Sequence, residues 1–256
     1  MTNTQALDRF FEAVAEYNLY SSPRNLQFYL HYLFQDVNLT GKKVLEIGAG
    51  AGLCSCYAAS SGAEKVISLE PEAAGSTAGV TDRFNKLSNA LGLSQVAMYP
   101  LTFQDFDPGN EKFDVILLDD CVNHLDEAAC VDLLRDAGAI EAYRNIFHKM
   151  YDIAADRAKI IITDCSRHNF FALLKRRNPF SPTIEWHKHQ APVTWMRLLA
   201  DAGFVNPMVK WASFNRLGSV GRLLGNKPAA FFLQSRFRIE MEKRPLPIEA
   251  RGSSPK

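Results

Sequence analysis

The sequence lacks the long apolar run that a membrane-spanning helix requires, since no window holds about 20 uninterrupted apolar residues. It also begins with polar residues rather than with the basic and then apolar segments of a secretory signal peptide. We therefore expect neither a transmembrane segment nor export, and we expect the protein to reside in the cytoplasm.

Cysteine is scarce, and its pattern excludes two common uses. The five cysteines are odd in number and include no C-x-x-C pair. Such a pattern favours neither a disulfide framework nor a structural zinc site. Free thiols fit a reducing compartment.

The chain as a whole also lacks an excess of positive or negative charge, because its net charge is only +1. With 47% hydrophobic and 22% charged residues, the composition is that of a folded globular protein and excludes disorder of the whole chain. The charge is uneven, however, because the part from Pro207 to Lys256 holds ten basic and three acidic residues, or +7. A phosphorylated substrate, a membrane surface, a nucleic acid or a solvated basic face could each account for this asymmetry.

Three glycines at alternate positions follow an apolar strand predicted at 44–47. Gly48, Gly50 and Gly52 allow the backbone to turn sharply and to approach a ligand closely. The helix expected after them would present free N–H groups to the same ligand. This stretch predicts a cradle for a nucleotide cofactor.

The spacing of the glycines separates two kinds of cofactor. A dinucleotide fingerprint, G-x-G-x-x-G, needs a glycine three residues after Gly50, where Leu53 stands instead. Glu46, two residues before the first glycine, would also repel a pyrophosphate. A carboxylate there suits a ligand that carries an ammonium group and a sulfonium.

At this motif the sequence resembles the class I S-adenosylmethionine (SAM)-dependent methyltransferases, whose first motif reads E/D-x-G-x-G-x-G. Glu46, Gly48, Gly50 and Gly52 fill its four defined positions. The resemblance extends from about 43 to 203. It implies an α/β, Rossmann-like fold with a seven-stranded, mostly parallel sheet, an antiparallel last strand and helices on both faces. It also implies SAM as the cofactor and S-adenosylhomocysteine as its product.

The order of expected elements agrees with that fold. Apolar residues at helical spacing over about 5–34 predict an N-terminal helical extension, 1–40, that covers the cofactor crevice as a lid or packs on the sheet. The main domain is expected over 41–244, with 165–190 as a substrate-cap insertion after the fifth strand. The tail, 245–256, is expected to be disordered. We expect further strands over 65–70, 95–99, 113–120, 158–163, 204–214 and 228–238, and helices over 53–61, 78–91, 126–155 (broken near Gly138) and 192–202.

The remaining cofactor contacts are predicted from strand ends. Glu70 closes the second strand, about 20 residues past the glycines, where an acid can accept hydrogen bonds from ribose hydroxyls. Ala49 and Pro71 are added as neighbours of the glycine turn and of Glu70. The resemblance assigns the adenine contacts to Asp105 and Phe106, with Phe103 and Gln104 as rivals.

Polar side chains that follow the fourth strand are the candidates for catalysis. Ligands of open α/β sheets lie outside the carboxyl ends of the strands, where strand order reverses. We therefore expect Asp119, Asp120, Asn123 and His124 near the transferred methyl group, with Asp119 also contacting the cofactor. The catalytic candidates are His124 as the leading general base, His168 as the second, and Asp120; His187 and His189 rank below them.

A divalent cation held by Asp119 or Asp120 together with Asp164 is an alternative route to an activated hydroxyl. The related metal-dependent O-methyltransferases usually follow the second acid with Asn, whereas Cys165 stands here. We therefore predict no metal ligands.

The sequence gives the least information about the identity of the methyl acceptor. The [D/N]-P-P-[Y/F] motif of amino-group methylation is missing after the fourth strand. We expect O-methylation of a small polar molecule or a saccharide by in-line transfer, with a sugar stacking on Phe170, Phe171, Trp186 or Trp195. A nucleic-acid methyltransferase that uses the basic C-terminal half is the alternative, and a non-catalytic SAM-binding regulator is disfavoured by the polar residues after strand four. No oligomeric state is predicted.

Overall fold

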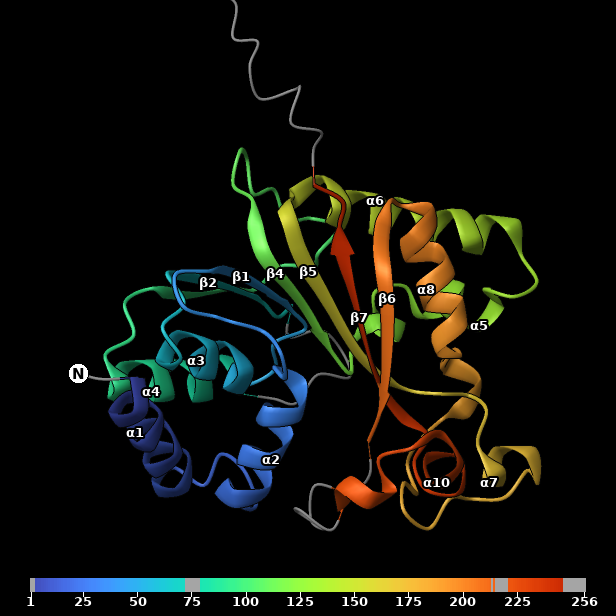
Figure 1. The fold of residues 1–256 in the computed structure, drawn as a ribbon, viewed down its shortest axis with the longest axis horizontal. Coiled ribbons are helices and arrows are strands. Elements are labelled where there is room, and N and C mark those ends of the chain that lie inside the picture. The colour runs from blue at the N-terminus through green and yellow to red at the C-terminus, as the bar shows by residue number, and fades with distance from the viewer. Residues whose placement is uncertain (1–2, 72–78, 213, 215–220, 246–256) are drawn as a thin grey trace, which may run out of the picture.

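The computed structural model describes residues 3–71, 79–212, 214 and 221–245. One sheet of seven strands runs through the molecule, and helices cover both of its faces (Figure 1). The strand order is β3-β2-β1-β4-β5-β7-β6. All pairs are parallel except those of β7, which is antiparallel to both β5 and β6. The strands are β1 Lys43–Ile47, β2 Lys65–Leu69, β3 Val96–Tyr99, β4 Phe113–Asp119, β5 Ala154–Cys165, β6 Phe204–Trp211 and β7 Arg236–Lys243.

The helices fall into two layers around this sheet. The longer ones are α1 Asn3–Glu16, α2 Pro23–Leu33, α3 Leu53–Ser60, α4 Val80–Leu91, α6 Ala137–Ile153 and α8 Pro192–Asp201. The shorter ones are η1 Val122–His124, α5 Glu127–Asp132, α7 Phe170–Leu173, η2 Trp186–Lys188, η4 Arg222–Leu224 and α10 Lys227–Phe232. None of the helices in the described ranges is long and apolar enough to cross a membrane.

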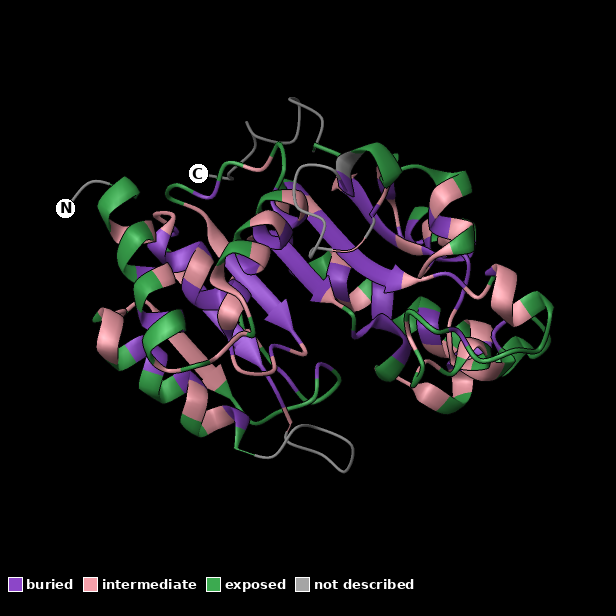
Figure 2. Cartoon of the chain, turned by 90° about the horizontal axis from the view of Figure 1, so that it is seen from below, coloured by how far each residue is buried: buried purple, intermediate pink, exposed green. Residues whose placement is uncertain are grey.

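The central strands are apolar on both faces because both faces are covered. Leu117 of β4 joins the apolar cluster formed with the N-terminal helices, whereas Ile116 and Leu118 join the cluster on the opposite face. In Figure 2 the central strands are largely buried and the helices expose their outer sides, whereas β3 and β6 also contain exposed residues. The predicted fold class, including the antiparallel last strand, is confirmed.

The N-terminal helices form part of the core. Phe10 and Val14 of α1, with Leu26 and Leu30 of α2, are buried in the cluster that also contains Val44 of β1. Their apolar residues at three- and four-residue spacing therefore pack toward the sheet.

One predicted strand is wrong. Residues 228–232 of the expected 228–238 strand belong to α10, and the last strand begins only at Arg236. The side chain of Asn226 accepts a hydrogen bond from the backbone N–H of Ala229 at 3.0 Å, and Pro228 lies in the first turn, where its missing N–H costs nothing. These start signals outweigh the strand propensity of the phenylalanines that follow. The expected tail lies outside the described residues from 246 onward.

Candidate active site

A cleft of about 660 Å³ lies at the carboxyl ends of the parallel strands. Gly48 and Gly50 line one side of it, and Asp119, Asp120 and His124 line another. Clefts of several hundred cubic ångströms suit small-molecule ligands and cofactors. The cleft therefore brings together the glycine turn after β1 and the polar residues after β4, as the sequence predicts.

The backbone of the glycine turn leaves no room for a side chain at two of its positions. Gly48 and Gly52 both have φ +70°, in the left-handed region that favours glycine. A Cβ atom at Gly48 would lie 2.6 Å from the Cβ of Cys121, and one at Gly52 would lie 2.3 Å from a ring carbon of Phe84. Both positions thus combine an unusual backbone conformation with close packing.

Glu70 supports the turn from the next strand. Its carboxylate accepts a hydrogen bond from the backbone N–H of Gly50 at 2.7 Å, and both Glu70 and Pro71 line the cleft. The backbone of Ala49 donates to the carbonyl of Leu69 at 3.0 Å. The turn is therefore held in place by the end of β2.

Glu46 lies behind this turn and does not line the cleft. It is 2% exposed and accepts a hydrogen bond from the hydroxyl of Ser55, which lies 2.6 Å from the hydroxyl of Ser68. Burial raises the pKa of Glu46 to about 8, so its carboxyl is mostly neutral near pH 7. Through Ser55 and Ser68 it connects β1 to α3 and β2. Its carboxyl is therefore not on the cleft wall, where the ligand contact predicted for it would have to form.

Asp119 and Asp120 share one cation. Arg236 of β7 lies 2.5 Å from Asp120 and 3.6 Å from Asp119, measured between guanidinium nitrogen and carboxylate oxygen. The hydroxyls of Tyr29 and Thr163 donate to the same oxygen of Asp119. Burial, followed by the charge of Asp120, raises the pKa of Asp119, and Arg236 opposes this rise. Two carboxylates and one guanidinium leave this side of the cleft with net negative charge.

His124 lies at the end of η1 with an exposed imidazole on the cleft wall. Its Nε2 lies 3.4 Å from the amide nitrogen of Asn123. Asn123 is 1% exposed, and its Oδ1 has no hydrogen-bond partner among the described residues. A neutral imidazole on a polar cleft wall can accept a proton from a bound hydroxyl.

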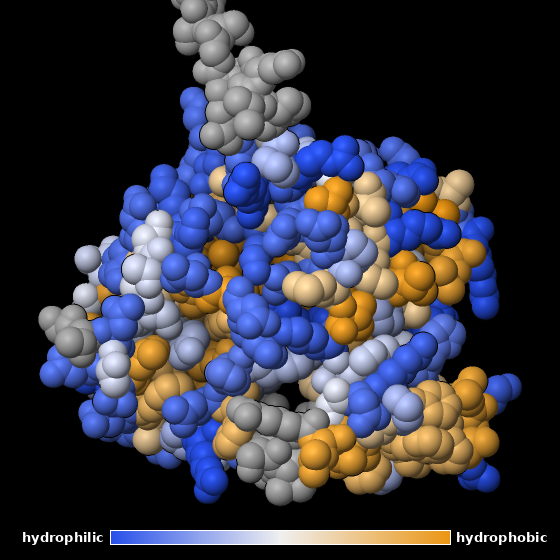
Figure 3. All heavy atoms as spheres, viewed as in Figure 1, coloured by the Kyte–Doolittle hydropathy of each residue, from blue (hydrophilic) through white to orange (hydrophobic). Residues whose placement is uncertain are grey.

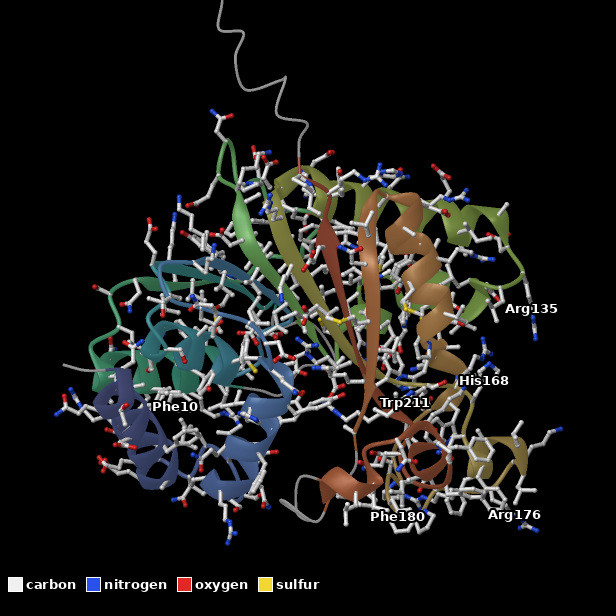
Figure 4. All side chains as sticks on the ribbon, viewed as in Figure 1. Phe10, Arg135, His168, Arg176, Phe180 and Trp211 are labelled. Carbon is white, nitrogen blue, oxygen red and sulfur yellow. The ribbon has the colours of Figure 1, made fainter. Side chains whose placement is uncertain are left out.

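Besides Glu46, Ala49 and Gly52 of the turn region, three further predicted site residues do not line the cleft. Asp105 is exposed and accepts a hydrogen bond from the hydroxyl of Thr102 at 2.6 Å, and Phe106 is buried in the core. The cleft is lined instead by the residues just before them, Leu101 to Gln104, which include both rivals named from the sequence. His168 is exposed in the loop before α7 (Figure 4) and does not line the cleft.

The expectation that Trp195 stacks on a sugar is wrong. Its side chain is fully buried, with its ring centroid 5.1 Å from that of Tyr143 and 6.2 Å from that of Phe147. Aromatic residues at helical spacing serve here as core.

The structure also shows a carboxylate–imidazole pair that the sequence did not predict. Asp164, at the end of β5, is buried, and its Oδ1 lies 2.7 Å from Nδ1 of His189. Burial raises the pKa of Asp164, and His189 opposes the rise. The partners are 25 residues apart across the cap, so no local spacing could have identified the pair. Asp164 is also the second acid of the metal alternative considered from the sequence; in the described residues no group of three or more His, Cys, Asp or Glu side chains is placed to hold a metal ion.

Three charged residues of the cleft lining form ion pairs with one another. Lys188 of η2 lies 2.6 Å from Glu127 of α5 and 2.8 Å from Glu185, measured between nitrogen and carboxylate oxygen. All three line the cleft. The insertion after β5 is thereby joined to the segment after β4, and it contributes directly to the cleft wall.

Several solved structures with the same architecture are described as SAM-dependent methyltransferases. A protein from Listeria monocytogenes provisionally assigned to that class is 13% identical, with a TM-score of 0.59 over 87% of this chain and 100% of that one. A SAM-dependent methyltransferase from Aquifex aeolicus is 14% identical, with a TM-score of 0.58 over 90% of this chain and 97% of that one.

The same fold also serves other chemistry. The [4+2]-cyclase SpnF is 9% identical to this chain, with a TM-score of 0.56 over 87% of this chain and 81% of its own. No protein-family model and no curated protein matches the sequence. Identities this low establish architecture and leave activity to be argued from the site. The protein has the fold of the class I SAM-dependent methyltransferases.

Proposed function

We propose that the protein is a SAM-dependent methyltransferase that methylates a hydroxyl group of a small polar molecule or a saccharide. The observation that carries the proposal is a single cleft in which the glycine turn and Glu70 face Asp119, Asp120 and His124. The turn would bind the cofactor, and the polar side chains would contact the acceptor.

The residues present fit SAM. The backbone of Gly48 and Gly50 would hold the amino-acid part of the cofactor, Glu70 would accept hydrogen bonds from the ribose hydroxyls, and apolar Leu101 and Phe103 would pack on the adenine. When bound, SAM supplies a methyl group that its own sulfonium charge activates. The chain therefore has to align the acceptor, and positioning of this kind can contribute about 7–11 kcal/mol.

The charge of the cleft favours a cationic cofactor over a dinucleotide. Five carboxylates line it, namely Glu70, Asp119, Asp120, Glu127 and Glu185, against Lys188 in the lining and Arg236, which pairs with two of them. A pyrophosphate or a nucleic-acid backbone would meet repulsion from this wall, whereas a sulfonium and an ammonium would be attracted. The same charge supports a neutral, polar acceptor over a polyanion.

His124 is proposed as the general base. Its exposed imidazole would take the hydroxyl proton as the acceptor oxygen forms a bond to the methyl carbon and the carbon–sulfur bond breaks. A base of this kind contributes about 10²–10⁴-fold in rate. Asp164 and His189 form the second candidate, although neither lines the cleft, since the buried carboxylate beside Nδ1 would orient the half-buried imidazole and stabilise its protonated form.

The experiment follows transfer of a labelled methyl group from SAM to a panel of polar small molecules and sugars. With an acceptor in hand, His124→Gln should lower kcat by about 10²–10⁴-fold. Affinity for S-adenosylhomocysteine should remain nearly unchanged. His187→Gln is the matched control, because His187 is exposed on η2 outside the cleft lining. Normal kcat in His124→Gln together with loss in His189→Gln would move the base to the Asp164 pair.

The cytoplasm is proposed as the compartment. All five cysteines are unpaired and four of them are buried, so the fold uses thiols as packing groups rather than as cross-links.

A further inference from the structure

An exposed apolar surface outside the cleft has no role in the function proposed above. It is formed by Leu173 at the end of α7, Leu174 directly after it, Phe180 in the following loop, Leu223 and Leu224 of η4, and Phe232 at the end of α10. We call these six residues the leucine–phenylalanine patch. Leu173 is 67% and Leu223 is 78% exposed. Figure 3 shows the apolar surface at the lower right of the molecule, where Figure 1 places α7 and α10.

Aromatic contacts and a buried hydrogen bond connect the segments that carry the patch. The ring centroid of Phe170 lies 5.2 Å from that of Phe232, and that of Phe171 lies 6.2 Å from that of Phe180. Buried Asn178 donates a hydrogen bond to the carbonyl of Leu233 at 2.7 Å. The cap and α10 are thus joined beneath the exposed side chains, which therefore stay on the surface instead of folding into a core.

Buried Asn169 adds to these connections. Its side chain donates to the carbonyls of Phe231 and Leu233 at 3.0 Å each. Two buried amides thus connect the cap with the segment after α10, although about 60 residues separate them in the sequence. A patch supported in this way is part of the fold, and large exposed apolar patches of folded proteins commonly mark contact sites.

The two chain segments that carry the patch contain only basic and neutral residues. The sequence contains no Asp or Glu in 166–184 or in 207–239. Lys175, Arg176 and Lys227 are exposed, and none of them pairs with a carboxylate of the described residues. Figure 4 shows Arg176 and Phe180 at the same corner of the molecule. Exposed Leu and Phe beside uncompensated Lys and Arg are the groups that bind the interface of an anionic membrane.

The position of the patch relates it to the cleft. Both α7 and α10 lie beyond the carboxyl ends of β4 and β5 (Figure 1). The cleft lies at the same end of the sheet. A surface that binds the patch would therefore lie on the side of the molecule on which the cleft lies.

We propose that the leucine–phenylalanine patch docks the protein reversibly onto the surface of an anionic phospholipid bilayer. Leucine and phenylalanine side chains enter the boundary between headgroups and acyl chains, while Lys175, Arg176 and Lys227 face the headgroups. A second copy of the chain fits this face less well, because a two-fold interface would bring the two basic rims together. No residue of the patch lines the cleft, so the proposal is independent of the proposed methyl transfer.

The experiment is co-sedimentation with vesicles of phosphatidylcholine containing about 30% phosphatidylglycerol, a fraction chosen to give a strongly anionic surface. The wild-type protein should bind them at least tenfold more tightly than vesicles of phosphatidylcholine alone, and more weakly as salt is raised. The double variants Leu173→Ser/Leu174→Ser and Lys175→Glu/Arg176→Glu should each lose at least tenfold in binding.

The matched control is Leu134→Ser, which removes a leucine that is 53% exposed outside the patch and should bind like the wild type. Unchanged thermal unfolding and unchanged binding of S-adenosylhomocysteine would show that the patch variants are folded. Failure of the wild type to sediment, or equal sedimentation of all variants, would overturn the proposal. A concentration-dependent dimer that Leu173→Ser/Leu174→Ser disperses would overturn it as well, by assigning the patch to a second copy. If the wild type bound vesicles but did not bind S-adenosylhomocysteine, the result would contradict the proposed function and leave the membrane proposal standing.

Discussion

Glu46 illustrates how one carboxyl can be essential to a motif while facing away from the ligand cleft. Its pKa is raised to about 8, foremost by burial and further by the charge of Asp119, although the hydroxyl of Ser55 opposes the shift. A protein that binds a proton more tightly when folded loses stability as the pH rises between the unfolded and folded pKa values. The stabilising contribution of the neutral carboxyl is complete below the ordinary value of 4.5 and is lost by about pH 8.

We predict that Glu46→Gln removes this pH dependence. The difference in free energy of unfolding, wild type minus variant, should fall as the pH rises from about 5 to 8, by at most about 1.4 kcal/mol per pH unit. Urea denaturation of both proteins across this range measures the difference, in which the other titrating groups cancel. Parallel curves would show that Glu46 is already ionised in the folded protein.

At the residue scale, the glycine turn and Glu70 could be predicted because glycine spacing and strand-end acids have local signatures. The positions of Glu46 and of Asp105 could not be predicted as readily. Alternation along β1 turns Glu46 toward α3, and the loop after β3 presents Phe103 and Gln104 rather than the two residues after them. A shift of one or two residues in a loop leaves no trace in composition or spacing.

The hydroxyls of two tyrosines connect the α2 helix to the carboxyl ends of the parallel strands and to β6. Tyr29 donates to Asp119 and accepts from Arg236 of β7 at 2.5 Å. Tyr32, three residues along the same helix, donates only to the backbone carbonyl of Lys210 at 3.1 Å. The first contact joins charged groups of β4 and β7, and the second joins two neutral groups. Hydrogen bonds to charged groups are worth more.

We predict that Tyr29→Phe destabilises the protein by about 1–3 kcal/mol, because Asp119 and Arg236 each lose a buried partner. Tyr32→Phe, the control on the same helix, should cost only about 0.5–1.5 kcal/mol. Chemical denaturation of both variants compares the two. If Tyr32→Phe cost as much as Tyr29→Phe, the charge-linked network would contribute nothing beyond an ordinary hydrogen bond.

Most elements could be predicted from periodicity and from Gly and Pro signals, and the exception at α10 has a definite cause. Phe231, Phe232 and Leu233 favour a strand in isolation, but Asn226 and Pro228 begin a helix just before them. The pairing of Asp164 with His189 was beyond prediction for a different reason. It depends on how the cap folds back, and that path is set by tertiary contacts such as those of Lys188 with Glu127.

At the scale of the whole molecule, charge is separated between the cleft and the outer surface. Carboxylates dominate the cleft lining, whereas the segments around α7 and α10 contain only basic charges. The basic C-terminal half noted in the sequence therefore contributes Arg236 beside the carboxylates of the cleft but does not outweigh them. Its exposed part adjoins apolar side chains, which favours a lipid surface over a nucleic-acid backbone as its partner.

The central claim is that the glycine turn is a SAM site, and calorimetric titration with S-adenosylhomocysteine tests it most directly. The wild type should bind one molecule saturably and should not bind NAD. Gly48→Ala should weaken binding at least tenfold, because its Cβ would displace Cys121 on the cleft wall. Gly109→Ala, which also has a positive φ but no atom within 4 Å of the added carbon, should bind normally. Binding of NAD without binding of S-adenosylhomocysteine would contradict the account.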